Sequence, residues 1–170
     1  MDADGLKGMY LRWLTEMWGA GKFEVAAEIF TEDVRDHNAY PGQPAGRAGQ
    51  VWAARMVRAA FPDLAFTPDV VTSDGKFVTG RWTMTGTNTG TMELFGIPPT
   101  GRPVTMTGQE IFRAAGGLFT EVWHQEDIGG MLSSLGLEPP PVIMRLAARR
   151  SARRYRRDRR RTTAPAADRT

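Results

Sequence analysis

The sequence predicts an α+β fold in which helices pack on one face of a mainly antiparallel sheet. Two observations favour this class. Apolar residues recur with helical spacing over the first 61 residues, and they alternate with period two from there to residue 127. Gly- and Pro-containing turns separate the alternating stretches, as in a strand meander. Helices followed by strands in this order are typical of α+β proteins.

Three helices are expected in the first part of the chain. The first has apolar residues at i, i+3, i+4, i+7, i+8 and i+11, namely Leu6, Met9, Tyr10, Trp13, Leu14 and Met17. Gly19 and Gly21 end it. A short second helix over 23–30 is followed by a strand over 34–38. After a loop with two Pro and two Gly, a third helix runs over 50–61 and ends before Pro62.

The following segments have the pattern of strands. An extended run over 64–73 is joined to an alternating strand over 77–88 by Asp74-Gly75, a strong turn signal. A short piece over 91–95 and a rigid loop over 96–101 precede a hairpin over 104–127, whose turn is Ala115-Gly116-Gly117. A short helix over 128–135 closes the predicted fold.

The composition excludes several classes of protein. A length of 170 residues with 41% hydrophobic content suits one domain with a real core. Cys is absent, which excludes disulfides, thiolate nucleophiles and Cys-ligated metals. No apolar run is long enough for a transmembrane segment, and the start MDADGLKG lacks the features of a secretory signal. We therefore expect a soluble cytoplasmic protein.

The basic charge is concentrated in the C-terminal tail. Three prolines at 139–141 mark a boundary, so we expect a domain over 1–138 and a Pro-hinged tail over 139–170. From 142 to 170 the tail carries eleven Arg and two Asp, a net charge of +9. Because the whole chain has a net charge of +3, the rest of the chain has a net charge of −6. Because like charges repel, disorder is expected, with a transient helix as the alternative. Such a tail suits weak contact with a polyanion, either nucleic acid or an anionic membrane. The alternatives are a solvated tail without a partner and docking to an acidic enzyme.

The hairpin places carboxylates on faces that ought to be buried. The residues that share a face are Val104, Met106, Gly108, Glu110 and Phe112 in its first strand, and Phe119, Glu121, Trp123, Gln125 and Asp127 in its second. A buried carboxylate is costly unless it is paired, hydrogen-bonded or protonated. We therefore expect the hairpin to line a cavity in which Asp127, with Glu110 nearby, transfers protons.

Several motifs occur in the order and spacing of SnoaL-like polyketide cyclases. They are Phe61-Pro62-Asp63-Leu64, the stretch 81–87, the loop 96–101, Thr107-Gly108 with Ile111-Phe112-Arg113, and Glu121-Val122-Trp123 with Asp127. Over 6–137 the chain therefore resembles this family. The resemblance implies a cone-shaped α+β barrel, with a curved sheet wrapped around the N-terminal helices and an apolar pocket. It also implies a cofactor-independent aldol-type ring closure of a polyketide-like carbonyl substrate, as in antibiotic biosynthesis.

In this resemblance Asp127 fills the position of the general acid/base of the family. One carboxylate can both take and give the proton if an apolar pocket moves its pKa towards neutrality. The alternative is that Asp127 caps the helix that begins at Ile128, because Asp is a favoured N-cap. Relatives with this fold carry out epoxide opening, isomerisation or hydroxylation-linked steps. A non-catalytic binding module is a further alternative.

Two further residues are candidates for catalysis. Glu110 is expected to orient Asp127 or to hold the substrate enol, with a salt bridge to Arg81 or Arg113 as the alternative. His37 lies where the family often has His and is expected to donate to a substrate carbonyl. His124 differs in parity from Trp123 and is expected to point away from the cavity.

The remaining expectations concern ligands and partners. No metal is expected, since neither HxH nor HExxH is present, and the absence of GxGxxG and of a Walker sequence gives no reason to expect a nucleotide cofactor. Candidate substrate-binding residues, of which many are expected to be simply core, are Trp13, Met17, Trp52, Met56, Phe61, Arg81, Trp82, Met106, Gln109, Phe112 and Trp123. The expected ligand is a hydrophobic polycyclic or polyketide compound. The resemblance also implies a homodimer or a higher homo-oligomer.

Overall fold

A computed structural model describes residues 2–93, 96–137 and 141–162 of the chain. The chain divides into two compact units, Met1–Gly136 and Leu137–Thr170, and each is described by itself. The predicted boundary at Pro139-Pro140 lies outside the described residues, as does the stretch 163–170.

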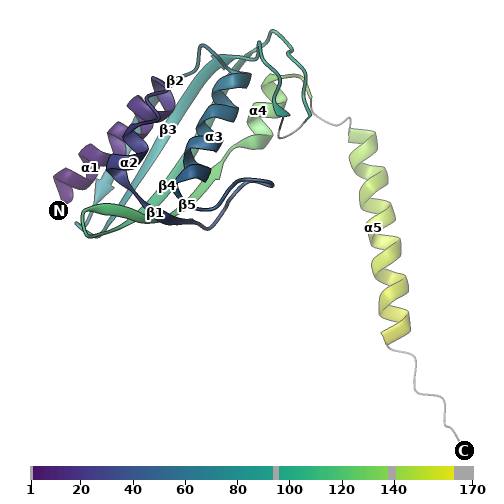
Figure 1. The fold of residues 1–170 in the computed structure, drawn as a ribbon. Helices are drawn as coiled ribbons and strands as arrows, with labels where there is room; N and C mark the ends of the chain where they lie inside the picture. Colours follow the sequence, from purple (N-terminus) through teal and green to yellow (C-terminus); the bar gives the residue numbers. More distant parts are fainter. Residues whose placement is uncertain (1, 94–95, 138–140, 163–170) are drawn as a thin grey trace, which may run out of the picture. The chain divides into compact units, whose positions relative to one another are not determined.

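The first unit consists of helices and one five-stranded sheet (Figure 1). The helices are α1 (Ala3–Arg12), the π-helix η1 (Trp13–Gly19), α2 (Val25–Ile29), α3 (Gly46–Ala60) and α4 (Ile128–Ser134). The strands are β1 (Phe30–Asp36), β2 (Ala65–Ser73), β3 (Phe77–Thr87), β4 (Pro103–Ala115) and β5 (Leu118–Glu126). Their order in the sheet is β1-β5-β4-β3-β2. The β1–β5 pair is parallel and the other three pairs are antiparallel, so the predicted α+β class is confirmed.

The helices cover one face of the curved sheet and enclose the core against it (Figure 1). Helices α1 and η1 pack on β2, whereas α3 packs on β1. The predicted inward face of β4 is confirmed, because Val104, Met106, Gly108, Glu110 and Phe112 are all buried. An isolated bridge joins Met92 to Ile97 within the loop between β3 and β4; the predicted short piece over 91–95 falls partly on residues outside the described ranges.

The predicted first helix changes its hydrogen-bonding pattern halfway along. Asp2 caps α1 by accepting a hydrogen bond from the Gly5 N–H at 2.8 Å, and the apolar stripe of α1 is buried as expected. From Trp13 onward the helix is of the wider π type. The apolar spacing predicts the buried stripe correctly but does not report this change.

Strand β5 contains a β-bulge that reverses the inward and outward faces after it. Glu121 pairs with Arg113 and Phe119 with Ala114, so Thr120 is an extra residue in β5. Because one extra residue exchanges the two faces of a strand, the predicted common face of Phe119, Glu121, Trp123 and Gln125 is wrong. After the bulge the inward-facing residues are Val122, His124 and Glu126.

The second unit differs from its prediction. A helix, α5 (Pro141–Thr162), occupies the tail where disorder was expected. Its Ala, Leu, Met and Arg residues are all strong helix formers, which explains helical structure despite the repulsion between like charges. Apolar side chains remain exposed on it, namely Val142, Ile143, Met144, Leu146 and Tyr155. Within the described ranges, no helix combines the length and the apolar character that crossing a bilayer requires.

Candidate active site

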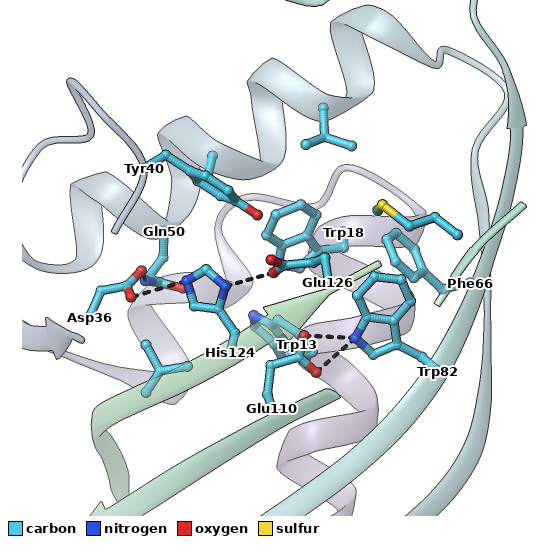
Figure 2. A pocket seen from close by; sticks show the side chains of 14 residues that line it. Trp13, Trp18, Asp36, Tyr40, Gln50, Phe66, Trp82, Glu110, His124 and Glu126 are labelled. Carbon is cyan, nitrogen blue, oxygen red and sulfur yellow. Dashed lines mark hydrogen bonds and ion pairs between the residues drawn. The ribbon is translucent and has the colours of Figure 1, made fainter. Parts of the chain in front are cut away.

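A cavity lies between the helices and the inner face of the sheet (Figure 2). Its volume is about 40 Å³, and its wall is mainly aromatic and aliphatic. The lining residues are Trp13, Trp18, Asp36, Tyr40, Gln50, Ala53, Val57, Phe66, Trp82, Met106, Glu110, Val122, His124 and Glu126. Three carboxyl groups and one imidazole therefore face an otherwise apolar space, which is the usual character of a small-molecule site.

Glu110 is the most deeply buried of these ionisable groups, with 3% of its surface exposed. The indole N–H of Trp82 donates to both carboxyl oxygens at 2.7 Å, and the Tyr10 hydroxyl donates to Oε2 at 3.1 Å. Burial raises the pKa of Glu110 to about 8, although these hydrogen bonds act in the opposite direction. Glu110 is therefore mostly protonated at neutral pH.

Two glycines make the contacts of Glu110 possible. Gly80 lies opposite Glu110 on β3, and a Cβ atom there would collide with the ring and hydroxyl of Tyr10. A Cβ atom at Gly108 would collide with the indole ring of Trp82. Both donors thus reach Glu110 because the strands carry no side chain at these two positions.

His124 lies between two carboxylates. Its Nε2 is 3.1 Å from Oδ1 of Asp36, and its Nδ1 is 2.6 Å from Oε1 of Glu126 (Figure 2). Burial alone would lower the pKa of His124, but the two carboxylates outweigh it and raise the pKa to about 10. His124 is therefore an imidazolium at neutral pH, and it donates a hydrogen bond from each nitrogen.

Asp36 is held at the end of β1 by several donors. Gln43 and Gln50 each donate a side-chain N–H to its Oδ2 at 2.9 Å, and the Asn38 N–H donates to Oδ1 at 2.9 Å. Burial raises the pKa of Asp36, but the hydrogen bonds from His124 and Gln43 more than offset this, so the pKa lies below its usual value. An ionised Asp36 thus fixes both the charge and the orientation of His124.

A second, smaller cavity adjoins the first. It has a volume of about 30 Å³ and shares Tyr40, Val57 and Met106 with the first cavity. The rest of its wall is apolar and consists of Met56, Phe61, Met92, Ile128 and Met131. The first cavity, which holds the ionisable groups, and the second, methionine-rich cavity therefore share three lining side chains.

The structure brings six of the predicted site residues to these cavities. Glu110, Trp13, Trp82 and Met106 line the first, and Met56 and Phe61 line the second with Met106. The other predicted substrate-binding residues do not line either cavity. Met17 and Phe112 are buried in the core, whereas Arg81, Gln109 and Trp123 lie on the outer side of the sheet. Trp52 also lies outside both cavities. Arg81 pairs there with Asp69 and Arg113 with Glu121, so neither forms the salt bridge considered for Glu110.

Asp127 does not lie inside a cavity. Its side chain is exposed and accepts a hydrogen bond from the Gly130 N–H at 2.8 Å, as the N-cap of α4. The residue opposite Glu110 in the hairpin is His124. The expected position of Asp127 among apolar groups is therefore wrong, because β5 ends at Glu126 and the chain turns into α4 there.

The positions of the two histidines are the reverse of the prediction. His37 stacks on Trp123, with ring centroids 4.3 Å apart, and its Nε2 lies 2.9 Å from Oε2 of Glu121. It does not line the cavity, whereas His124 does. The bulge at Thr120 accounts for His124, since it turns the even-numbered residues of β5 inward.

The sequence analysis did not identify Trp18, Asp36, Tyr40, Gln50, His124 and Glu126 as site residues. The alternation of His124 and Glu126 with Val122 was visible in the sequence, but assigning these residues to the inner face of the sheet requires knowledge of the bulge.

Both ring nitrogens of His124 contact carboxylates. Within the described residues, no three His, Cys, Asp or Glu side chains are arranged to hold a metal ion.

Comparisons with known proteins identify related chains. The profile of a family described as SnoaL-like polyketide cyclase matches residues 8–135. TsrD from Streptomyces laurentii superposes with a TM-score of 0.74 at 25% identity, covering 81% of this chain and 99% of TsrD. IdmH, a candidate polyketide cyclase from Streptomyces antibioticus, has a TM-score of 0.64 at 30% identity, covering 76% and 98%. A comparison with curated protein sequences gives no significant match.

We predict that Gly108→Ala destabilises the fold. The added Cβ would collide with the Trp82 ring, and overpacking of this kind costs about 1–3 kcal/mol. Gly8→Ala is the matched control. Gly8 is exposed in α1 with no atom within 4 Å of an added Cβ, so that variant should gain about 0.5–1 kcal/mol. Urea unfolding gives both free energies; an unchanged stability of Gly108→Ala would contradict the close approach of Trp82.

The stability of the protein should fall as the pH rises from 6.5 to 10. The folded-state pKa of His124, about 10, lies above its unfolded value of 6.5, so its contribution is complete below pH 6.5 and is lost as the pH passes 10. Glu110, with a pKa raised from 4.5 to about 8, adds to the fall up to pH 8. Urea midpoints across this range measure the slope. His124→Gln should flatten the decline above pH 8; a wild-type midpoint that stays constant would rule out the raised pKa values.

Proposed function

The chain belongs to the SnoaL-like polyketide cyclase family, and on this basis we propose that it closes a ring in a polyketide-like carbonyl compound. The proposed reaction is an intramolecular aldol addition in which side chains of the protein take the proton from the substrate and give one back to it. It deprotonates a carbon next to a carbonyl group and protonates the oxygen of a second carbonyl. The proposal requires a base and an acid that face the same apolar space.

One observation carries the proposal: two carboxyl groups with different surroundings face the first cavity. Glu110 on β4 is buried and mostly protonated, whereas Glu126 on β5 is hydrogen-bonded to the His124 imidazolium. Glu126 pairs across the strands with Gly108, and Glu110 pairs with His124. Glu110 and Glu126 are therefore diagonal neighbours on the same face of the sheet, and the backbones of such neighbours are typically about 7–8 Å apart. Environments that give carboxyl groups different proton affinities suit paired acid and base roles.

In the proposed reaction Glu126 is the base. It takes a proton from the carbon between two carbonyl groups, and the electrons of the broken C–H bond form an enolate. The enolate carbon then adds to a second carbonyl carbon of the same molecule, and the new alkoxide oxygen takes the proton of Glu110. The reaction moves one proton from carbon to oxygen, and the starting state returns when a proton passes from Glu126 to Glu110 through water.

His124 and Asp36 are assigned positioning roles. The imidazolium holds the Glu126 carboxylate at the cavity through its Nδ1–H, and Asp36 fixes the ring through its Nε2–H. An uncharged residue in place of His124 would leave Asp36 and Glu126 facing each other with unbalanced negative charge. The arrangement therefore gives the carboxyl group of Glu126 a fixed hydrogen-bond partner at the cavity wall.

The substrate requires the cavity to expand. Volumes of about 40 and 30 Å³ hold a few water molecules, whereas sites for organic ligands usually measure about 300–1,000 Å³. Tyr40 lies in the loop after β1, where its N–H donates to the Gln43 side chain, and Met106 is unbranched and flexible. We propose that displacement of Tyr40 and Met106 joins the two cavities and admits the apolar part of the substrate.

Exchange of single residues tests the assignment of acid and base. Glu126→Gln and Glu110→Gln should each lower the rate about a hundredfold or more, the usual contribution of acid/base catalysis. Asp127→Asn should keep the wild-type rate, because Asn is an equally good N-cap. The assay is retro-aldol cleavage of a naphthyl β-hydroxy ketone to a fluorescent naphthaldehyde and a small ketone, which is the reverse of an intermolecular aldol addition and uses the same kinds of proton transfer.

Loss of activity in Asp127→Asn together with full activity in Glu126→Gln would return the catalytic role to Asp127.

The mass of the product formed from a polyketide substrate distinguishes ring closure from epoxide opening. Aldol closure leaves the mass unchanged or lowers it by one water, whereas epoxide opening by water raises it. Recovery of the bound compound without conversion to any product would favour a non-catalytic module.

Two contacts with partners are proposed as well. The outer face of the sheet carries Ile111, 46% exposed, together with the stacked pair of His37 and Trp123, which suits pairing with a second copy of the chain. Helix α5 exposes the side chains of six Arg residues within 145–156, which suits contact with a polyanion. The two surfaces belong to different units of the chain.

Removal of residues 137–170 tests both contacts in one comparison. The shortened chain should keep the mass of a dimer or higher oligomer in light scattering, since the outer sheet face is intact, and it should lose retention on heparin. A monomeric full-length chain would contradict the first contact. Equal heparin retention of the two chains would contradict the second.

A further inference from the structure

Two buried hydrogen-bond donors, on side chains that line the first cavity, have no partner in the protein. Within the described residues, the buried side-chain nitrogen and oxygen atoms that lack a hydrogen bond are Nε1 of Trp13 and Nε1 of Trp18. Both residues line the cavity, and Trp13 is only 4% exposed (Figure 2). Folded proteins satisfy most buried polar groups, so an unpaired buried donor calls for an explanation.

The third cavity-lining indole provides an internal comparison. Trp82 donates its N–H to Glu110 at 2.7 Å. Trp13, by contrast, packs against the rings of Tyr10, Phe112 and Trp18, and the Trp18 ring packs against Phe66. These rings provide contact area but no strong acceptor. The protein therefore satisfies one indole of the cavity and leaves two for another molecule.

The π-helix explains why both indoles reach the cavity. Residues five positions apart on an α-helix point about 140° away from each other. In η1 the turn is wider, with the Ala20 N–H donating to the carbonyl of Thr15, five residues earlier, at 2.9 Å. Trp13 and Trp18 consequently lie together, with ring centroids 5.9 Å apart. A rare helix type thus places two donors on one wall.

The charges in the cavity limit what these donors can bind. Asp36 and Glu126 carry two negative charges against the single positive charge of His124, so a ligand carboxylate or phosphate is disfavoured. Neither indole can accept a proton or change its charge. A neutral carbonyl oxygen, or the partly negative oxygen of a forming enolate, suits two neutral donors in a largely apolar space. The oxygen would lie in the same cavity as the proposed base.

We propose that the indole N–H groups of Trp13 and Trp18 donate to the carbonyl oxygens of an enolisable dicarbonyl compound and stabilise its enolate. This inference rests on the proposed function for the identity of the ligand, and its contacts are measurable without turnover. It assigns Trp13 and Trp18 as ligand-binding donors in addition to the proton-transferring groups. The apolar body of the same compound would extend towards the second cavity.

Spectroscopy of the indole groups in the full-length protein tests the contacts directly. The chain has five Trp residues and therefore five indole ¹H–¹⁵N resonances, with those of Trp13 and Trp18 assigned from Trp13→Phe and Trp18→Phe. The probe is an acetylnaphthol, whose adjacent carbonyl and hydroxyl oxygens mimic an enolised dicarbonyl. The matched control is ethylnaphthalene, which has the same flat body without oxygens.

Acetylnaphthol should move the Trp13 and Trp18 resonances downfield by several tenths of a part per million. Ethylnaphthalene should cause no downfield shift, and the resonances of Trp52 and Trp123, outside the cavity, should stay in place with either compound. Each Phe variant should bind acetylnaphthol about tenfold more weakly, the effect of losing roughly one hydrogen bond. Its affinity for ethylnaphthalene should be unchanged.

Two results would overturn the inference. One is that both resonances remain unmoved at the highest acetylnaphthol concentration. The other is that the Phe variants lose affinity for both compounds equally, which would show a packing role only. A wild-type protein that gives the indole shifts but has no retro-aldol activity would refute the proposed function and leave the two donors assigned.

Discussion

The burial of one carboxyl group, that of Glu110, is the constraint to which the rest of the site conforms. A carboxyl group in the middle of a sheet face is tolerated only when donors satisfy its oxygens, and here Trp82 from β3 and Tyr10 from α1 do so. Both donors need an empty position on the strands, which Gly108 and Gly80 provide. The packing of α1 on the sheet brings Tyr10 to Glu110, and burial outweighs the hydrogen bonds in keeping Glu110 protonated.

One positive charge, that of His124, partly offsets the negative charges around the cavity. The imidazolium joins Asp36 at the end of β1 to Glu126 at the end of β5, two strands that pair in parallel. Because His124 faces Glu110 across the hairpin, a cation, a carboxylate and a neutral carboxylic acid meet within one apolar space. Such a set can hold and release protons at neutral pH. The proposed displacement of Tyr40 and Met106 would enlarge this small space.

Much of the fold follows from local patterns in the sequence. The alternation in 104–112 correctly placed Glu110 on the buried face, and the helical spacing of Leu6, Tyr10 and Trp13 correctly gave a buried stripe. Position-by-position motifs were sufficient to recognise the family over nearly the same residues that its profile matches. The same patterns failed for β5, since period two assumes an uninterrupted strand and Thr120 interrupts it.

The sequence by itself determined the class of the fold, the family, and the presence of a buried carboxyl group at residue 110, because these depend on neighbours along the chain. Only the tertiary structure decided which groups meet that carboxyl group. Tyr10 lies 100 residues away from it in sequence, the bulge at Thr120 turns His124 inward, and the end of β5 leaves Asp127 as a helix cap in solvent. A hydrogen bond across such separations depends on strand register and helix packing, neither of which a local pattern contains.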